Sequence, residues 1–258
     1  MYAIITGASN GIGKELARCL LSRLDIILVA RSEDKLIKLT KEYNNLSKRF
    51  MYNHKVSYEV CDVSDAKECI RLYNKYKGLD IQVLINNAGS GTFGEFSDID
   101  LDKELNSINT NIIGVHVLTK LFLRDMLKKN RGYIMNVASS AGYMPGSPYM
   151  ASYYASKAYV LNLTRAILRE DSVINSNVYV SALCPGPVDT GFNEAAGIHS
   201  SAKGWTARRL AKYAVKKMYE GDEIILPGIV VKATYVGRKI IPDGLLLKIA
   251  GRWQEKKL

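Results

Sequence analysis

Short apolar runs rich in β-branched residues recur along the chain, and a segment with helical periodicity separates each run from the next. The runs are Tyr2–Thr6, Ile26–Val29, Val56–Val60, Val83–Asn86, Tyr133–Val137, Val178–Leu183 and Ile224–Leu226. A strand, a helix and a second strand parallel to the first form a right-handed βαβ unit. A chain of such units predicts a parallel sheet with helices on both faces. The runs are continuous rather than alternating, as expected of strands buried on both faces. We therefore predict a doubly wound α/β fold.

Length and composition limit the possible organisation. With 258 residues, 47% of them apolar, the chain is long enough for one large domain with a substantial core. No basic segment followed by an apolar stretch opens the chain, which predicts a cytoplasmic rather than a secreted protein. The uncharged stretch from Gly132 to Ser156 carries two prolines and five serines, so we do not expect it to span a membrane. The four scattered cysteines are expected to be reduced thiols, and the three distant histidines predict no metal site.

The turn after the first run is rich in glycine and reads Thr6-Gly7-Ala8-Ser9-Asn10-Gly11-Ile12-Gly13. Glycines between a strand and a helix allow a sharp turn and bring backbone N–H groups close to a pyrophosphate at the positive end of the helix. For one isolated motif, a tight turn without any ligand is an equally good interpretation. Its position after the first strand favours a dinucleotide site in a Rossmann-like fold.

The end of the second run indicates which dinucleotide would bind. An NAD enzyme of Rossmann type carries an acidic residue here for the adenosine ribose, whereas this chain has Ala30-Arg31-Ser32. A guanidinium can hold a 2′-phosphate that a carboxylate would repel. We therefore predict NADP(H) as cofactor, with Arg31 and Ser9 as phosphate ligands; a solvated arginine at a strand end is the alternative.

The spacing TGxxxGxG is similar to the glycine motif of the classical short-chain dehydrogenase/reductase family, and four further stretches resemble that family in the expected order. Cys61–Val63 is similar to the residues that line the adenine, and Asn86–Gly89 matches the family's NNAG beside the cofactor. Asn111 matches the helix asparagine that orders a proton-relay water, and Pro185–Thr190 resembles the PGxVxT that holds the nicotinamide. The resemblance covers residues 2–195.

The resemblance implies a set of cofactor-binding residues and a set of catalytic residues. The implied cofactor set is Gly7, Ser9, Asn10, Gly11, Ile12, Gly13, Arg31, Asp62, Val63, Asn87, Ala88, Gly89, Tyr153, Lys157, Pro185, Gly186, Val188 and Thr190. The implied catalytic set is Asn111, Ser139, Tyr153 and Lys157.

Three tyrosines surround Lys157 in the stretch SYYASKAY. A nearby ammonium group favours phenolate and should lower the pKa of a tyrosine that shares its helix face. Tyr153 and Tyr154 lie four and three residues before Lys157, so helix geometry admits both, whereas Tyr159 lies two residues beyond it, toward another face. The family's YxxxK motif maps onto Tyr153 and Lys157, which implies that Tyr153 is the acid.

Two adjacent serines, Ser139 and Ser140, follow the fifth run, and only one of them should reach the site because neighbouring residues at a strand end point to opposite faces. Matching the family's S-x-A-G motif selects Ser139, whereas counting thirteen residues back from Tyr153 selects Ser140. We favour Ser139, because a one-residue insertion in the following loop would reconcile the two.

The C-terminal part is apolar and basic, with thirteen Lys and Arg against five Asp and Glu after residue 202. We divide the chain into a dinucleotide-binding and catalytic domain over 1–228, with a substrate lid near 191–204, and an extension over 229–258. The extension should pack on the same domain or on a partner. Leu246, Ile249 and Trp253 form its expected apolar stripe, with Lys248, Arg252 and Lys256 opposite. Such a helix can lie on an anionic membrane, but we favour a cover for the core or for a subunit interface.

These patterns predict an NADP(H)-dependent oxidoreductase that reduces a ketone or aldehyde, or oxidises the corresponding alcohol, with tyrosine as general acid or base. The substrate would be a small carbonyl or alcohol, and an apolar or lipid-like one fits the apolar lid. The resemblance implies a homodimer or homotetramer packed through the helices that carry Asn111 and Tyr153. The alternatives are a peripheral membrane reductase of a lipid ketone and a non-catalytic NADP(H) sensor. We expect no nucleic-acid partner, because the basic residues are not interleaved with exposed aromatics.

Overall fold

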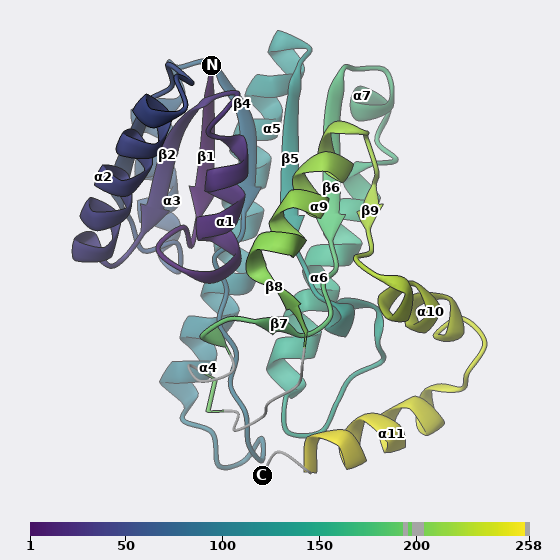
Figure 1. Ribbon diagram of the computed structural model, residues 1–258. Coiled ribbons are helices and arrows are strands. Elements are labelled where there is room, and N and C mark those ends of the chain that lie inside the picture. Colours follow the sequence, from purple (N-terminus) through teal and green to yellow (C-terminus); the bar gives the residue numbers. More distant parts are fainter. Residues whose placement is uncertain (193–195, 198–203, 256–258) are drawn as a thin grey trace.

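In a computed structural model, which describes residues 1–192, 196–197 and 204–255, seven parallel strands form one sheet (Figure 1). The strands are β1 (Tyr2–Thr6), β2 (Asp25–Ala30), β3 (Val56–Val60), β4 (Ile81–Asn86), β5 (Gly132–Val137), β6 (Val178–Leu183) and β9 (Ile224–Ile225). Their order across the sheet is β3-β2-β1-β4-β5-β6-β9. The predicted doubly wound α/β fold is confirmed, and each predicted run contributes one strand.

The order of the strands reverses beside β1, because β2 and β3 lie on one side of it and β4 lies on the other. In open α/β sheets of this kind, ligands bind outside the carboxyl ends of the strands at the point of reversal. The turn after β1 and the residues that follow β4 therefore lie where a ligand site is expected.

Helices cover both faces of the sheet. The main helices are α1 (Gly11–Leu20), α2 (Glu33–Arg49), α3 (Ala66–Tyr76), α4 (Leu101–Ile108), α5 (Val115–Lys129), α6 (Ala151–Ile167), α7 (Asp171–Ile174), α9 (Ala207–Tyr219), α10 (Ile229–Gly237) and α11 (Asp243–Glu255). Successive strand residues enter different cores, as the two-residue period of a strand requires: Ala3 and Ile5 pack with α1, α2 and α9, whereas Ile4 packs with α3 and α5. The continuous apolar runs are therefore explained by burial on two faces.

Several elements beside the carboxyl ends of the strands were not predicted. The segment Asn109–Gly114 is a π-helix that joins α4 to α5, and Ser140–Tyr143 is a short 3-10 helix after β5. Two residue pairs form a separate small sheet from β7 (Val188–Asp189) and β8 (Trp205–Thr206). The predicted lid near 191–204 falls mostly outside the described residues; Phe192 and Ala196 are described and belong to one apolar cluster.

The C-terminal extension forms α10 and α11, which project from one corner of the molecule (Figure 1). The three residues of the expected stripe, Leu246, Ile249 and Trp253, are not buried together, since Leu246 is buried but Ile249 and Trp253 are 54% and 45% exposed. The inner face of α11 instead carries Leu246, Ala250, Gly251 and Gln254. Small residues allow the close approach: a Cβ on Gly251 would lie 3.3 Å from the Pro148 ring. Of the predicted basic side, Lys248 and Arg252 are exposed, and Lys256 lies outside the described residues.

Candidate active site

A cleft of about 540 Å³ lies at the carboxyl ends of the strands, where the order reverses. Almost every predicted cofactor residue lines it, together with Ser139, Ser140, Tyr153 and Lys157. Two predicted residues do not: Gly13 and Asn111 lie behind its wall. The fold thus brings together segments from the turn after β1, the ends of β2 to β6 and helix α6.

The turn after β1 requires glycine at two positions for different reasons. Gly7 has a φ of +63° and a Cβ there would lie 2.8 Å from Ala88 Cα, so both conformation and space exclude a side chain. A Cβ on Gly13 would lie 2.4 Å from the Gly7 carbonyl oxygen, which makes Gly13 a packing residue rather than a ligand contact. Asn87 holds the turn to β4, since its Nδ2 donates to the carbonyl oxygens of Thr6 and Gly7 at 2.9 and 3.2 Å.

Helix α1 opens toward the cleft. It begins at Gly11, and the Asn10 side chain makes no capping hydrogen bond to it. The first turn contains no acidic residue, so the N–H groups and positive end of the helix are available to an anion. The Ser90 hydroxyl, which is buried in the cleft wall, has no hydrogen-bond partner within the part of the chain that the structure describes. Both features fit a polar, anionic dinucleotide.

Arg31 lies at the end of β2, where its side chain is 64% exposed and its Nη1 lies 3.8 Å from the Asp62 carboxylate. This contact is long and exposed, so it leaves the guanidinium available to another anion. Lys35, in the first turn of α2, lines the same part of the cleft beside Ser32. The sequence analysis did not predict Lys35 as a site residue. The first turn of α2 brings it to the same end of the cleft as Arg31.

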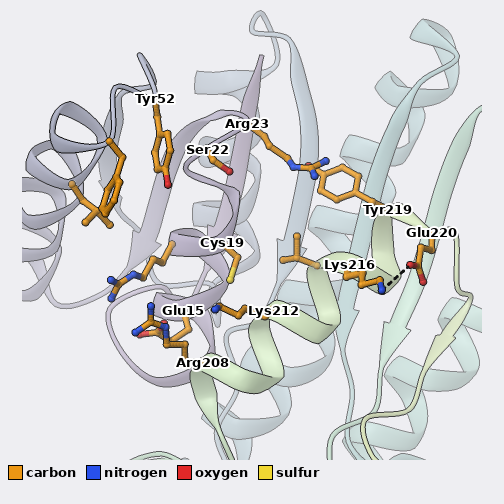
Figure 2. A pocket seen from close by; sticks show the side chains of 14 residues that line it. Glu15, Cys19, Ser22, Arg23, Tyr52, Arg208, Lys212, Lys216, Tyr219 and Glu220 are labelled. Atoms are coloured by element: carbon orange, nitrogen blue, oxygen red, sulfur yellow. Dashed lines mark ion pairs between the residues drawn. The ribbon is translucent and has the colours of Figure 1, made fainter.

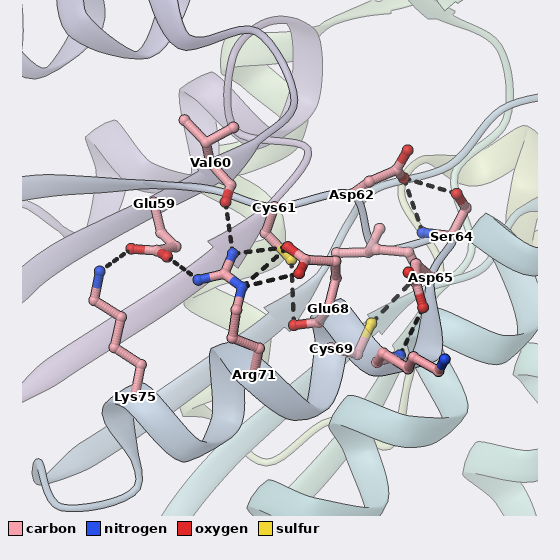
Figure 3. A network of polar contacts seen from close by, with 12 residues as sticks. Glu59, Val60, Cys61, Asp62, Ser64, Asp65, Glu68, Cys69, Arg71 and Lys75 are labelled. Carbon is pink, nitrogen blue, oxygen red and sulfur yellow. Dashed lines mark hydrogen bonds and ion pairs between the residues drawn. The ribbon is translucent and has the colours of Figure 1, made fainter.

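The loop that carries Asp62 and Val63 is held in place by a charged network between β3 and α3 (Figure 3). The nearly buried Glu59 carboxylate pairs with Arg71 at 2.6 Å and with Lys75 at 2.5 Å. Asp62 Oδ1 accepts hydrogen bonds from the backbone N–H and the hydroxyl of Ser64 at 3.0 and 2.8 Å. The loop at the adenine end of the predicted cofactor site is therefore ordered by its own polar contacts.

The two candidate serines face different partners. The Ser139 side chain faces Tyr153, where it acts to lower the pKa of the phenol, and it accepts a hydrogen bond from the N–H of Ala141 at 3.1 Å. Ser140 directs its side chain to the Tyr143 hydroxyl, and its N–H donates to the Pro185 carbonyl oxygen at 2.8 Å. The geometry therefore joins Ser139, rather than Ser140, to the tyrosine predicted as the acid.

Tyr153 and Lys157 lie on one side of α6, with Lys157 Nζ 5.8 Å from the Tyr153 ring centroid. Lys157 is almost fully buried and donates a hydrogen bond of 2.9 Å to the Val137 carbonyl oxygen. Burial lowers the pKa of Lys157 to about 8. Burial also raises the pKa of Tyr153 to about 12, against the opposing effect of the Ser139 hydrogen bond. In this structure the pKa of Tyr153 is raised, because the loss of solvent dominates, and the lowering expected from Lys157 stays a prediction.

Asn111 lies in the π-helix and is completely buried behind Ser90. Its Oδ1 accepts from the Ser90 N–H at 3.0 Å, and its Nδ2 donates to the Ser90 carbonyl at 2.8 Å and to Ser156 Oγ at 3.0 Å. Gly89 lies between this amide and the lysine, because a Cβ there would lie 3.0 Å from Asn111 Oδ1 and 3.3 Å from Lys157 Nζ. Asn111 therefore approaches Lys157 but does not face the cleft.

Several cleft residues were not predicted as site residues. Tyr154 lines the cleft, but Ser147 and Gln254, rather than Ser139, act on the pKa of its hydroxyl. Phe192 lies against Tyr153, with ring centroids 5.3 Å apart. Trp253 and Gln254 add α11 to the wall of the cleft. The sequence motifs do not include this helix, so only the fold shows that it reaches the site.

Comparison with known proteins identifies the family. A family model described as short chain dehydrogenase matches residues 1–200. The chain belongs to the short-chain dehydrogenase family. Its relatives include a very-long-chain 3-oxoacyl-CoA reductase of Anas platyrhynchos, 36% identical over 66% of this chain and 54% of the duck protein. They also include the granaticin polyketide synthase putative ketoacyl reductase 1 of Streptomyces violaceoruber, 36% identical over 76% of this chain and 71% of that protein.

Solved structures show the same fold. A short-chain dehydrogenase from Sphingobium yanoikuyae in complex with NADPH superimposes with a TM-score of 0.83, at 25% identity over 95% of this chain and 94% of the other. One from Burkholderia phymatum in complex with NAD gives 0.81, at 24% identity over 91% of each chain. The chain spans about half of the length of the duck relative. Structures solved with NADPH and with NAD share the fold of this member of the short-chain dehydrogenase family.

A second hollow lies on the outer side of α1, beside α9 and the end of α2 (Figure 2). It is lined by cations such as Arg18, Arg208 and Lys212 and by aromatic residues such as Tyr52 and Tyr219. None of the predicted catalytic or cofactor residues of the dehydrogenase lines this hollow. Its position away from the carboxyl ends of the strands separates it from the candidate active site.

The four cysteines of the dehydrogenase are unpaired, as predicted. Burial raises the pKa of the Cys184 thiol, which lies beneath the active site, to about 12. A thiol with this pKa stays protonated near neutral pH and is a poor nucleophile. Within the described ranges, no cluster of His, Cys, Asp and Glu could hold a metal ion, and none of the helices is both long and apolar enough to cross a membrane.

Proposed function

We propose that this short-chain dehydrogenase reduces a ketone with NADPH, and that Tyr153 donates the proton. The observation that carries the proposal is the meeting of Ser139, Tyr153 and Lys157 in one cleft, opposite the glycine turn. A bound NADPH supplies the hydride in such a reaction. The residues of the chain would then provide the proton, the contact with the substrate oxygen and the position of both reactants.

Tyr153 suits the role of proton donor. Its pKa of about 12 keeps the phenol protonated near neutral pH, so its hydroxyl can donate to the alkoxide that develops on the substrate oxygen. The Ser139 side chain lies beside it and could donate a second hydrogen bond to the same oxygen. Lys157 is held to Val137 and would bind the ribose of the cofactor while supporting Tyr153. Asn111, behind Gly89, would support a proton relay through Lys157.

NADP(H) rather than NAD(H) is the proposed cofactor. Arg31, Lys35 and Ser32 gather at the end of β2, where a 2′-phosphate of the adenosine ribose would lie. The two positive charges of Arg31 and Lys35 exceed the one negative charge of Asp62, so the net charge at this end of the cleft is positive. The guanidinium of Arg31 can form a forked pair of hydrogen bonds to a phosphate, which a neutral ribose cannot match.

A 3-oxoacyl compound is the proposed class of substrate. The names of two relatives specify a 3-oxoacyl-CoA reductase and a putative ketoacyl reductase. Beyond Tyr153, the cleft is lined by Phe192, Met150 and Trp253, which suit an acyl chain rather than a sugar.

The test compares two adjacent tyrosines. NADPH oxidation is followed with a panel of ketones that includes 3-oxoacyl thioesters, and NADPH binding is measured separately by fluorescence titration. We expect Tyr153→Phe to lose about a hundredfold or more in turnover while it still binds NADPH, and Tyr154→Phe to remain active. Full activity of Tyr153→Phe would contradict the assignment. Cofactor binding without turnover of any ketone by the wild-type protein would instead support an NADP(H) sensor.

A further inference from the structure

The C-terminal extension exposes more apolar surface than any other segment of similar length in the described chain. Nine of the twenty-one exposed large apolar residues lie within residues 229–253. They are Ile229, Val230, Val236, Ile240, Ile241, Leu245, Leu247, Ile249 and Trp253. Isolated exposed apolar residues are ordinary, but a concentration of this kind marks a surface that another apolar phase covers.

The exposed residues of α11 form a stripe. Leu245, Ile249 and Trp253 recur at four-residue spacing on one side of the helix. Lys248 and Arg252 each directly precede a residue of this stripe, so they lie along one edge of it. Leu246 and Ala250 lie along the other edge and are buried against the domain. The apolar stripe therefore has a cationic edge that faces solvent.

The turn between α10 and α11 repeats this arrangement. Ile240 and Ile241 are 79% and 37% exposed, and they directly follow Arg238 and Lys239. The exposed beginning of α10, at Ile229 and Val230, is followed by Lys232. Asp243, one of the two acidic residues of the extension, is already paired with Arg238 at 3.1 Å. Most of the positive charge beside the apolar residues is therefore unneutralised.

We propose that α10 and α11 dock this dehydrogenase onto an anionic lipid bilayer, with their exposed apolar residues in the headgroup region and the bordering cations on lipid phosphates. Both helices are too short to span a bilayer, whereas an amphipathic helix in the interface needs only an apolar face with a basic border. A second copy of the chain fits less well, because a two-fold interface would place this basic surface against the same basic surface of the other copy.

The docking surface is joined to the active site. The Tyr143 hydroxyl bonds to the Val231 carbonyl oxygen at 3.2 Å and to Thr234 Oγ1 at 2.7 Å, which fixes α10 to the segment after Ser139. Gln254 Nε2 lies 3.3 Å from Met150 Sδ, which fixes α11 to the start of α6. Trp253 belongs both to the exposed stripe and to the wall of the cleft. A lipid-like carbonyl compound, the substrate class of the proposed function, could thus pass from the bilayer surface past Trp253 into the cleft.

The test measures binding to lipid without reference to catalysis. The purified protein is sedimented with vesicles of phosphatidylcholine that contain phosphatidylglycerol, and with vesicles of phosphatidylcholine alone. We expect strong binding to the anionic vesicles, weakening with added salt, and at least about a tenfold weaker affinity for Ile240→Asp/Ile249→Asp, which places two charges in the apolar face. The matched control is Met51→Asp/Ile174→Asp, at residues that are 82% and 58% exposed and lie on other surfaces, and it should bind like the wild type.

Three results would overturn the proposal. The first is wild-type protein that remains in the supernatant with every vesicle. The second is vesicle binding that the Ile240→Asp/Ile249→Asp variant retains. The third is a wild-type dimer in analytical ultracentrifugation that this variant dissociates. Reduction of a water-soluble ketone by the same variant is measured in parallel, so that failure of docking is distinguished from failure of the proposed reductase activity.

Discussion

Lys157 Nζ donates a hydrogen bond of 2.9 Å to the carbonyl oxygen of Val137, twenty residues earlier in the chain. This bond fixes α6 to the end of β5. The helix that carries Tyr153 therefore keeps a constant position relative to the segment that leads from β5 into the active site. Burial removes the water that would solvate the ammonium group, and the hydrogen bond to Val137 replaces only part of that solvation. The charged form is therefore disfavoured, and the pKa of Lys157 falls to about 8.

Lys157→Met is expected to stabilise the fold near neutral pH and to abolish turnover. The folded-state pKa of Lys157 is lowered to about 8 from the ordinary lysine value of 10.5. Between these two values the unfolded chain binds more protons, so the contribution of Lys157 to stability rises with pH over this window. The advantage of Lys157→Met over the wild type should therefore shrink, by on the order of 3 kcal/mol, from pH 7 to pH 10. Urea unfolding at several pH values measures it, and a difference that does not vary with pH would contradict the lowered pKa.

Ser139→Ala and Ser140→Ala should have unequal effects on catalysis. The Ser139 side chain faces Tyr153 and acts to lower the pKa of its hydroxyl, whereas the Ser140 side chain faces Tyr143. We expect Ser139→Ala to lower kcat/KM by about a hundredfold through loss of a donor to the substrate oxygen, with little change in NADPH affinity. Ser140→Ala should change kcat/KM far less. Steady-state kinetics of the two variants decide the matter, and the reverse order would assign the role to Ser140.

Gly13→Ala is expected to destabilise the protein and to weaken cofactor binding. The added Cβ would lie 2.4 Å from the Gly7 carbonyl oxygen and 2.4 Å from Asn87 Nδ2, so the glycine turn must move. Crowding of this kind typically costs about 1–3 kcal/mol. Gly78→Ala is the control, because a Cβ there meets no atom within 4 Å. Thermal unfolding and NADPH titration of both variants measure the effect; equal behaviour would show that the turn tolerates a methyl group.

Arg31→Ala should reduce the preference for NADPH over NADH. Removal of the guanidinium leaves the Asp62 carboxylate, 3.8 Å away in the wild type, to act on the adenosine ribose. A lost charge-assisted hydrogen bond is worth about 1.5–3 kcal/mol, which corresponds to at least about a tenfold rise in KM for NADPH. The KM for NADH should change little. Lys35→Ala should shift the same ratio in the same direction, and an unchanged ratio in both variants would argue against NADP(H) as the preferred cofactor.

The sequence by itself determined the layered α/β fold and most of the cleft. Strands buried on both faces are continuously apolar, so the central strands were visible as apolar runs, whereas the edge strand β3 carries polar and exposed residues. The carboxyl ends of the parallel strands then indicated where the site would lie. Resemblance to the family's motifs then selected Ser139, Tyr153 and Lys157, all of which line that cleft. These features depend on residues that are close together in the chain or on the order of the strands, and both can be predicted from the sequence.

Only the tertiary structure decided what depends on contacts between distant segments. The pKa of Tyr153 rises because the surrounding fold removes water, an effect that the four-residue spacing to Lys157 does not contain. Ser139 and Ser140 are adjacent in the sequence, but their side chains face different tyrosines, Tyr153 and Tyr143 respectively. The buried face of α11 consists of Leu246, Ala250, Gly251 and Gln254, of which the expected stripe contained only Leu246, and Gly251 lies against Pro148. A helical pattern gives the period of a face, but its partner in the fold decides which face is buried.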